Sequence, residues 1–242
     1  HEANGWLVSW LADGKETREA ISADQYERAA QLVVERAKVH GALSGIGVRV
    51  VAPGAFFQEH RRLADQYLTR LNKAQEFAPL HVGSTLAEIN QLRALFPHAP
   101  LFAASDSAFH KTLPAVAAAY ALPRGLVDQF ELRRFGYHGL SLRSTIRKIQ
   151  TEGSAIPEKI IVCHLGSGSS VTALKNGESI ETSMGFSPLE GLVMATRSGS
   201  IDPAPRRWRP KSRAIQMPGA IPARLVRGKR SQTPPPPVGW LH

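Results

Sequence analysis

The sequence has one cysteine, no apolar run long enough to span a membrane and no internal repeat, and each absence excludes a class of protein. Cys163 has no second thiol with which to form a disulfide inside the chain, so nothing indicates an oxidising compartment. The longest apolar stretch near the start, Trp6 to Ala12, is too short to cross a bilayer and has no basic segment before it. We therefore expect neither a membrane span nor a signal peptide, and we expect Cys163 to be a small buried strand residue.

Acidic residues are missing from one part of the chain, residues 204–242. This tail holds nine of the 30 Lys and Arg residues and none of the 20 Asp and Glu residues. Taking those nine away leaves 21 basic side chains against 20 acidic ones, so nine of the ten units of formal positive charge belong to the tail. The tail also holds eight of the 17 prolines and shows no apolar period, so we expect it to be disordered. It could instead be a basic arm for nucleic acid or membrane surfaces, or an unnatural extension such as a shifted reading frame would produce.

The body of the chain alternates helical and strand-like patterns, with a hydrophobic content of 43% that is ordinary for a soluble globular protein. A capping box at Ser22 and Gln25 predicts a helix that runs to about Lys38. The other patterns predict a mostly buried strand at 46–51, a short strand at 101–104, helices at 58–74, 86–95 and 141–151, and a helix that follows His110.

A β-meander is predicted for the part that follows. Strands at 159–164, 171–174 and 179–182 are joined by a glycine-rich turn and by Asn176-Gly177, the strongest two-residue hairpin signal. Helices and strands that alternate before a meander indicate an α/β protein. We divide the chain into an N-terminal α/β domain (1–150), the start of a second α/β domain with the meander (151–203) and the basic Pro- and Arg-rich tail (204–242).

The glycine-rich turn, residues 164–170, is a candidate anion site. Glycines let the backbone approach a ligand closely, and successive N–H groups can form a nest for an anion. The turn is not a Walker A loop, because no Gly-Lys-Ser/Thr follows and the next predicted element is a strand. A plain hairpin turn is the alternative interpretation.

Four charged or titratable side chains are candidates for chemistry. Asp106 follows a short strand, where a carboxylate can hold Mg²⁺ or a water at a nucleotide, or can cap the next helix. Arg49 and Arg197 carry planar guanidinium groups that match carboxylate and phosphate oxygens, although Arg49 could also face water on an edge strand. His138 could donate a hydrogen bond to a phosphoryl group or serve as a structural hydrogen-bonding residue.

Five segments, in this order, carry a resemblance to one family. They are Asp106 to His110, Arg133 to Gly139, His164 to Ser170, Thr182 to Gly191 and Thr196 to Pro203. Together they resemble the signatures of the acetate kinase family, over roughly Gly5 to Pro203. The resemblance implies the fold of the actin-like ATPase (ribonuclease H-like) superfamily, a two-domain α/β kinase of which the second domain is incomplete here. The implied activity is reversible, Mg²⁺-dependent phosphoryl transfer between ATP and acetate, which gives acetyl phosphate and ADP.

The resemblance also implies a role for each candidate residue. Arg49 would bind the carboxylate or acyl phosphate, and Arg197 would stabilise the transferring phosphoryl group. His138 would donate a hydrogen bond to that group, and Asp106 would be the catalytic acid/base or a metal-organising residue. The phosphate-binding loop for ATP would consist of His164, Leu165, Gly166, Ser167 and Gly168. The small apolar pocket for the methyl group would consist of Val51, Leu80 and Pro188.

Several features depart from the family pattern. Ala52-Pro53-Gly54 stands where the family usually has His-Gly-Gly, and Ser167, Leu142 and Ser200 stand where it has Asn, His and Asp. The family's first strand with its metal-binding Asn, and its C-terminal adenosine-binding and metal-binding motifs, have no counterpart. The metal ligands are therefore unknown, and we expect the chain alone to have little or no activity.

Two alternatives to an acetate kinase remain at this point. The first is a propionate or butyrate kinase with the same site, because a pocket of Val, Leu and Pro discriminates chain length weakly. The second is a non-catalytic nucleic-acid-binding protein that uses the basic tail. The resemblance favours the kinase, with a short-chain carboxylate, acetyl phosphate and ATP/ADP as its ligands, and implies a cytoplasmic homodimer without nucleic acid.

Overall fold

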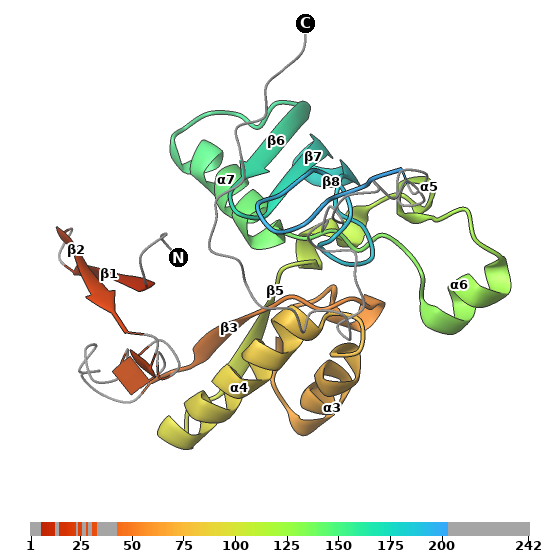
Figure 1. Ribbon diagram of the computed structural model, residues 1–242. Coiled ribbons are helices and arrows are strands. Elements are labelled where there is room, and N and C mark those ends of the chain that lie inside the picture. Colours follow the sequence, from red (N-terminus) through yellow and green to blue (C-terminus); the bar gives the residue numbers. More distant parts are fainter. Residues whose placement is uncertain are drawn as a thin grey trace, which may run out of the picture.

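The computed structural model describes residues 6–12, 15–22, 24–25, 28, 31–32 and 43–202. The strands in this part of the chain are β1 (Trp6–Ala12), β2 (Lys15–Ile21), β3 (Ile46–Val50), β4 (Arg61–Arg62), β5 (Leu101–Ser105), β6 (Lys159–Leu165), β7 (Ser169–Lys175) and β8 (Glu178–Thr182). The helices are α3 (Asp65–Ala74), α4 (Pro79–Leu95), α5 (Ala115–Ala118), α6 (Arg124–Phe130) and α7 (Gly139–Thr151), with 3-10 helices η1 (Ala55–Phe57) and η2 (Ala108–Thr112). Strands and helices alternate before a meander, as the sequence predicts (Figure 1).

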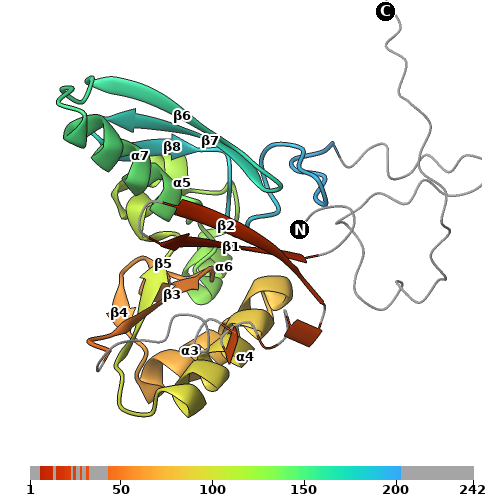
Figure 2. The same ribbon diagram turned by 90° about the vertical axis from the view of Figure 1, so that its left-hand side faces the viewer.

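A three-stranded sheet in the order β3–β5–β4 forms one layer, and Figures 1 and 2 show α3 and α4 packed against it. β3 runs parallel to β5, and β4 runs antiparallel to it. The buried core between sheet and helices is apolar and includes Val48, Val50, Leu63, Tyr67, Leu71, Val82, Ile89 and Ala103. Only one face of β3 contributes to it, because Gly47 and Arg49 are exposed. The strand is therefore half-buried, which corrects the prediction of a mostly buried strand.

The predicted meander is confirmed as the antiparallel sheet β6–β7–β8. Asn176 and Gly177 join β7 to β8 with φ of 52° and 80°, the positive values that a tight hairpin turn requires. Helix α7 contacts β6 of this sheet and also β5 and η2 of the preceding part. It therefore bridges the two sheets, and the division of the chain at residue 150 stays a prediction.

The helix predicted from Gln58 begins only at Asp65, so the first part of that prediction was wrong. Gly54, with φ of 117°, leads instead into η1. The short strand β4 then pairs with Phe102 and Ala103 of β5. Pairing with a strand some forty positions away overrides the helical apolar period, which is a tertiary effect that a local pattern does not contain.

Other helices begin or end at residues that differ from the predicted ones, and some elements were not predicted. The helix predicted after His110 is η2, which includes His110, followed by the four-residue α5. Helix α4 begins at Pro79, ahead of the predicted Leu86, and its proline occupies the first helical position, where no hydrogen bond is lost. The β1–β2 hairpin and α6 were not predicted.

The N-terminal capping box is confirmed. The backbone N–H of Ser22 donates to Gln25 Oε1 at 2.9 Å, and that of Gln25 donates to Ser22 Oγ at 3.3 Å. Most of the helix predicted to Lys38, and the tail 204–242, lie outside the described residues. Among the residues that are described, no helix has the length and apolar character needed to cross a membrane.

Cys163 is exposed, so the prediction of a buried cysteine was wrong. It lies on β6 between Ile161 and Leu165, residues that are 71% and 73% exposed. Alternate residues of a strand share a face, and β6 is at the edge of its sheet. Within the described part of the chain that face of β6 is exposed, which is why an apolar run contains exposed residues.

Candidate active site

Asp106 and Arg49 meet at the carboxyl ends of two parallel strands. Val50, at the end of β3, lies opposite Ser105, at the end of β5, so their sequence neighbours are brought together. Arg49 Nη2 donates to Asp106 Oδ2 at 2.7 Å. The side chain of Asp106 is 2% exposed and that of Arg49 is 58% exposed, so the pair joins a buried carboxylate to a cation that reaches solvent. In open α/β sheets this edge is where ligands bind.

The Asp106 carboxylate acts as an anchor for two donors. Its Oδ2 also accepts a hydrogen bond from the backbone N–H of His138 at 2.9 Å. Burial opposes the charged form, but the hydrogen bond and charge of Arg49, together with the N–H of His138, hold the pKa of Asp106 below its usual value. The next helix, η2, has Ser107 at its N-cap, so the alternative of a helix-capping role for Asp106 is wrong.

His138 is held in place at the start of α7. Its backbone has φ of 64°, in the left-handed region, and the following Gly139 donates its N–H to the carbonyl of Asp106 at 2.8 Å. A Cβ on Gly139 would lie only 2.4 Å from that carbonyl oxygen, so this close approach requires glycine. The backbone of His138 is thus fixed to the loop that carries Asp106.

The imidazole ring of His138 is buried between polar partners. Its Nδ1 lies 2.9 Å from Ser170 Oγ, and the ring stacks on that of His164 with 4.0 Å between centroids. Burial, reinforced by the neighbouring charges of His164, Arg49 and Arg197, lowers the pKa of His138 to about 4 despite the opposing effect of Asp106. The ring is therefore neutral at pH 7 and carries one N–H.

Arg197 and His138 converge on the glycine-rich turn. A Cβ placed on Gly168 would lie 2.9 Å from Arg197 Nη2 and 3.2 Å from His138 Nε2. Arg197 is aimed there because its Nη1 donates to the carbonyl of Pro188 at 2.8 Å. Burial and the charge of Arg49 lower the pKa of Arg197, yet a guanidinium stays charged at neutral pH. A cation and an imidazole nitrogen thus converge on the turn at Gly168.

The turn from residue 164 to 168 is a preformed hairpin between β6 and β7. Gly166 donates its N–H to the carbonyl of Gly168 at 3.1 Å, and Ser167 accepts at its carbonyl from the N–H of Ala195 at 3.2 Å. His164 Nδ1 lies 3.0 Å from Ser141 Oγ on α7, while Leu165 is exposed. The structure thus shows the hairpin interpretation, and ATP binding by these five residues stays a prediction.

The three residues predicted to hold a methyl group lie in three different parts of the structure. Val51 packs against a buried cluster of Tyr137, Met184 and Met194. Pro188 is buried in the segment that fixes Arg197. Leu80 lies in α4, and its side chain is outside the described part of the chain.

A polar network that the sequence did not predict holds the segment after β8. Arg134 Nη2 lies 3.1 Å from Glu190 Oε1, and the hydroxyl of Tyr120 donates to Oε2 of the same carboxylate. The N–H of Phe186 in turn donates to the Tyr120 hydroxyl at 2.7 Å. These contacts fix the segment from which Pro188 orients Arg197. Ser170 lies in the candidate turn, but its contact with His138 was not predicted, although strand alternation places it on the buried face of β7 with Thr172 and Leu174.

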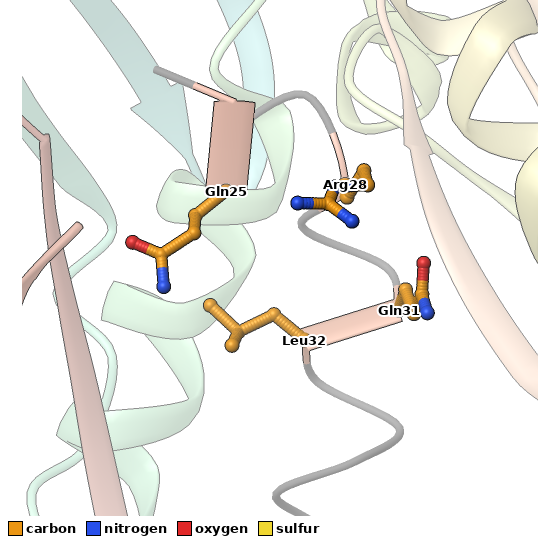
Figure 3. A pocket seen from close by; sticks show the side chains of 4 residues that line it. All are labelled: Gln25, Arg28, Gln31 and Leu32. Atoms are coloured by element: carbon orange, nitrogen blue, oxygen red, sulfur yellow. The ribbon is translucent and has the colours of Figure 1, made fainter. Parts of the chain in front are cut away.

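Neither a group of metal ligands nor the pocket of the N-terminal segment adds a residue to this site. Among the described residues, no three His, Cys, Asp or Glu side chains are grouped as a metal ion would need. A pocket lined by Gln25, Arg28, Gln31 and Leu32 belongs to the N-terminal segment and contains no candidate site residue (Figure 3). The converging donors beside Gly168 therefore remain the candidate site.

The sequence model of the Acetokinase family matches residues 2–218. The chain belongs to this family. The acetokinase match begins before Gly5 and continues past Pro203, the limits that the sequence motifs indicated. The chain is 39% identical over 213 residues to an acetate kinase of Caldanaerobacter subterraneus subsp. tengcongensis, which covers 83% of this chain and 53% of that protein. An acetate kinase of Thermoanaerobacter pseudethanolicus is 42% identical over the same shares of the two chains.

Solved structures of this family have the same fold. A propionate kinase from Francisella tularensis superposes with a TM-score of 0.69 at 33% identity, covering 83% of this chain and 53% of that one. An acetate kinase from Porphyromonas gingivalis gives a TM-score of 0.67 at 27% identity and the same coverage. The predicted actin-like α/β kinase fold with an incomplete second domain is therefore confirmed. The chain spans about half the length of the relatives it matches.

Proposed function

We propose that this chain contributes the acyl-substrate and phosphoryl half of an acetate kinase, which transfers a phosphoryl group reversibly between ATP and acetate. One observation carries the proposal: Arg197 Nη2 and His138 Nε2 lie within 3.2 Å of one point beside Gly168. A phosphoryl group in transfer spreads its charge over three oxygens, and the protein contributes by positioning it and stabilising that charge. A cation and a neutral imidazole that converge on one turn are suited to this task.

The electrostatics of the site support an anionic ligand. Arg49 and Arg197 are close enough for the charge of Arg49 to lower the pKa of Arg197. The carboxylate of Asp106 forms an ion pair with Arg49, so it compensates one of the two cations. A bound phosphoryl group would relieve the remaining repulsion between the cations.

Arg49 and Asp106 have complementary parts in the proposed reaction. Arg49, more than half exposed and anchored at one Nη atom, would present its other donors to the carboxylate of acetate or the acyl group of acetyl phosphate. Asp106 is buried, and its Oδ2 accepts hydrogen bonds from Arg49 Nη2 and from the backbone N–H of His138. We therefore assign Asp106 the positioning of Arg49 and of the His138 backbone.

The apolar cluster beside Arg49 is the proposed site for the methyl group. Val51 follows Arg49 by two residues and packs against Tyr137, Met184 and Met194. The structural neighbour from Francisella tularensis is a propionate kinase, so propionate is the second candidate substrate. One methylene in such a pocket changes the free energy of binding by about 1–3 kcal/mol, so acetate and propionate should be compared directly.

Further properties are proposed from the family resemblance. Mg²⁺ would enter with ATP as the counter-ion of its phosphates. We propose a cytoplasmic homodimer, with acetyl phosphate as the product made from acetate. Since the chain spans about half of its relatives, we expect little or no turnover from the chain alone.

The test measures acetyl phosphate formed from acetate and Mg-ATP, trapped as the hydroxamate. It compares the 242-residue chain with a chimera in which residues 1–202 replace the matching part of the Caldanaerobacter acetate kinase, so that everything the chain does not match is restored. We expect activity from the chimera, and a loss of at least a hundredfold in kcat on Arg197→Ala, because a charge-stabilising donor contributes about 3 kcal/mol or more.

The matched control is Arg124→Ala, which removes a 94% exposed arginine on α6. It should leave the rate unchanged. A folded chimera that fails with acetate, propionate and butyrate would refute the proposed function. Full turnover by the 242-residue chain alone would refute the expectation that this chain needs the rest of the kinase for activity.

A further inference from the structure

Ser170 and His138 form a buried pair behind the site. Ser170 is fully buried at the start of β7, and its Oγ lies 2.9 Å from His138 Nδ1. The opposite ring nitrogen, Nε2, is the one that lies close to Gly168 and the Arg197 guanidinium. The serine therefore contacts the imidazole on the side away from the space where we place the phosphoryl group.

The position of the hydroxyl proton follows from the partners that Ser170 has. A buried hydroxyl that is left without an acceptor costs free energy, and His138 Nδ1 is the acceptor that the described contacts offer to Ser170 Oγ. If Ser170 donates to Nδ1, then Nδ1 carries no proton. The single N–H of the neutral ring must then be on Nε2, which faces the space beside Gly168.

We propose that Ser170 is a positioning residue that fixes the tautomer of His138, so that the Nε2–H donates to the anion bound beside Gly168 and Arg197. With the other tautomer, Nε2 would present a lone pair to an anion and repel it. This inference rests on the proposed function for the identity of the anion, but the tautomer itself is a property of the free chain. It gives the hydroxyl a role that neither its burial nor its place in a strand requires.

The chain contains a chemically matched pair away from the site. Ser179 Oγ lies 2.8 Å from His110 Nδ1, and His110 Nε2 lies 2.9 Å from the carbonyl of Tyr137. Ser179 and His110 are as buried as Ser170. Ser179→Ala therefore removes the same hydrogen bond at a similar depth without touching the residues beside Gly168.

The experiment records ¹⁵N chemical shifts of the histidine rings in the labelled 242-residue chain, with signals assigned through His138→Gln. Inorganic phosphate is then titrated into the wild-type chain, Ser170→Ala, Ser170→Thr and Ser179→Ala. We expect a protonated Nε2 and an unprotonated Nδ1 for His138 in the wild type. In Ser170→Ala the two shifts should move toward each other as the tautomers mix, and phosphate should bind about tenfold more weakly, as expected for losing an oriented donor to an anion.

The control variants separate positioning from stability. Ser170→Thr retains the hydroxyl and should restore both the tautomer and the affinity, while Ser179→Ala should change the His110 signals alone. A wild-type His138 protonated on Nδ1, or a Ser170→Ala chain that keeps both tautomer and affinity, would overturn the inference. A wild-type chain with the expected tautomer and no affinity for phosphate would instead contradict the anion site of the proposed function, and leave Ser170 as the residue that orients His138.

Discussion

Replacing Gly168 with alanine adds one methyl group at the point where Arg197 and His138 converge. The new Cβ would lie 2.9 Å from Arg197 Nη2 and 3.2 Å from His138 Nε2. The first distance is too short for a carbon, so the guanidinium must move away. The methyl would then stand between the turn and the two groups that we expect to contact the phosphoryl oxygens.

The cost to folding should be small. Gly168 does not have a positive φ, so alanine can adopt its backbone conformation without strain. Replacing such a glycine restricts the unfolded chain and stabilises the folded one by about 0.4–1 kcal/mol. The side chain that must yield is the flexible end of Arg197. We therefore expect the free energy of unfolding to change by less than about 1 kcal/mol.

The cost to anion binding should be larger. One hydrogen bond to a charged group contributes about 1.5–3 kcal/mol, and each 1.4 kcal/mol corresponds to a tenfold change in Kd. Losing the contact with Arg197 should thus weaken phosphate binding by tenfold or more. The assay is an NMR titration of the ¹⁵N-labelled chain with inorganic phosphate, alongside urea unfolding of the same variant.

Gly125→Ala is the matched control, because a Cβ on Gly125 would meet no atom within 4 Å. It should gain up to about 1 kcal/mol of stability as a helix residue and bind phosphate like the wild type. If Gly168→Ala binds phosphate as tightly as the wild type, the anion does not occupy the space beside Gly168. If Gly168→Ala unfolds while Gly125→Ala does not, the geometry of the turn has been misjudged.

One further variant and one labelling reaction test the surroundings of the site. Asp106→Asn should lower the free energy of unfolding at pH 7 by about 1–3 kcal/mol, because it removes the carboxylate that anchors Arg49. Since the pKa of Asp106 is lowered on folding, its stabilisation is present above the ordinary value of 3.8 and is lost as the pH falls through the lowered pKa. The difference between wild type and Asp106→Asn in urea unfolding should therefore shrink near pH 3, and a constant difference would contradict the ion pair. Cys163 should react with Ellman's reagent in the native chain without denaturant, because it is exposed, and a reaction that waits for unfolding would show the face of β6 to be covered.

The elements that the sequence predicted best are those fixed by neighbouring residues. Asn176-Gly177 supplies the two positive φ values of the β7–β8 turn, and the apolar strands on either side pair across it. The β1–β2 hairpin carries a similar signal, because Asp13-Gly14 lies between its strands in the sequence. In both hairpins the turn residues alone indicate where two strands pair.

Burial, and pairing between segments far apart in the sequence, could not be predicted from neighbouring residues. β4 forms because Arg61 and Arg62 find β5, and no local pattern in 58–64 records that pairing. Cys163 has apolar neighbours, yet it is exposed because nothing in the described chain covers that face of β6. Both errors arose from treating a property of the assembled fold as a property of a window of sequence.

The candidate site illustrates why motifs can identify residues without showing how they act together. Asp106, His138, Gly168 and Arg197 come from the end of β5, the start of α7, the β6–β7 turn and the segment after β8. Backbone groups lock these pieces to each other, as when His138 donates its N–H to Asp106 and Pro188 accepts from Arg197. After these contacts are made, the groups still directed at the space beside Gly168 are a guanidinium and an imidazole nitrogen. If Ser170 places the imidazole proton on Nε2, both are donors. A ligand that completes the site must then bring several acceptor oxygens and negative charge, and a phosphoryl group has both.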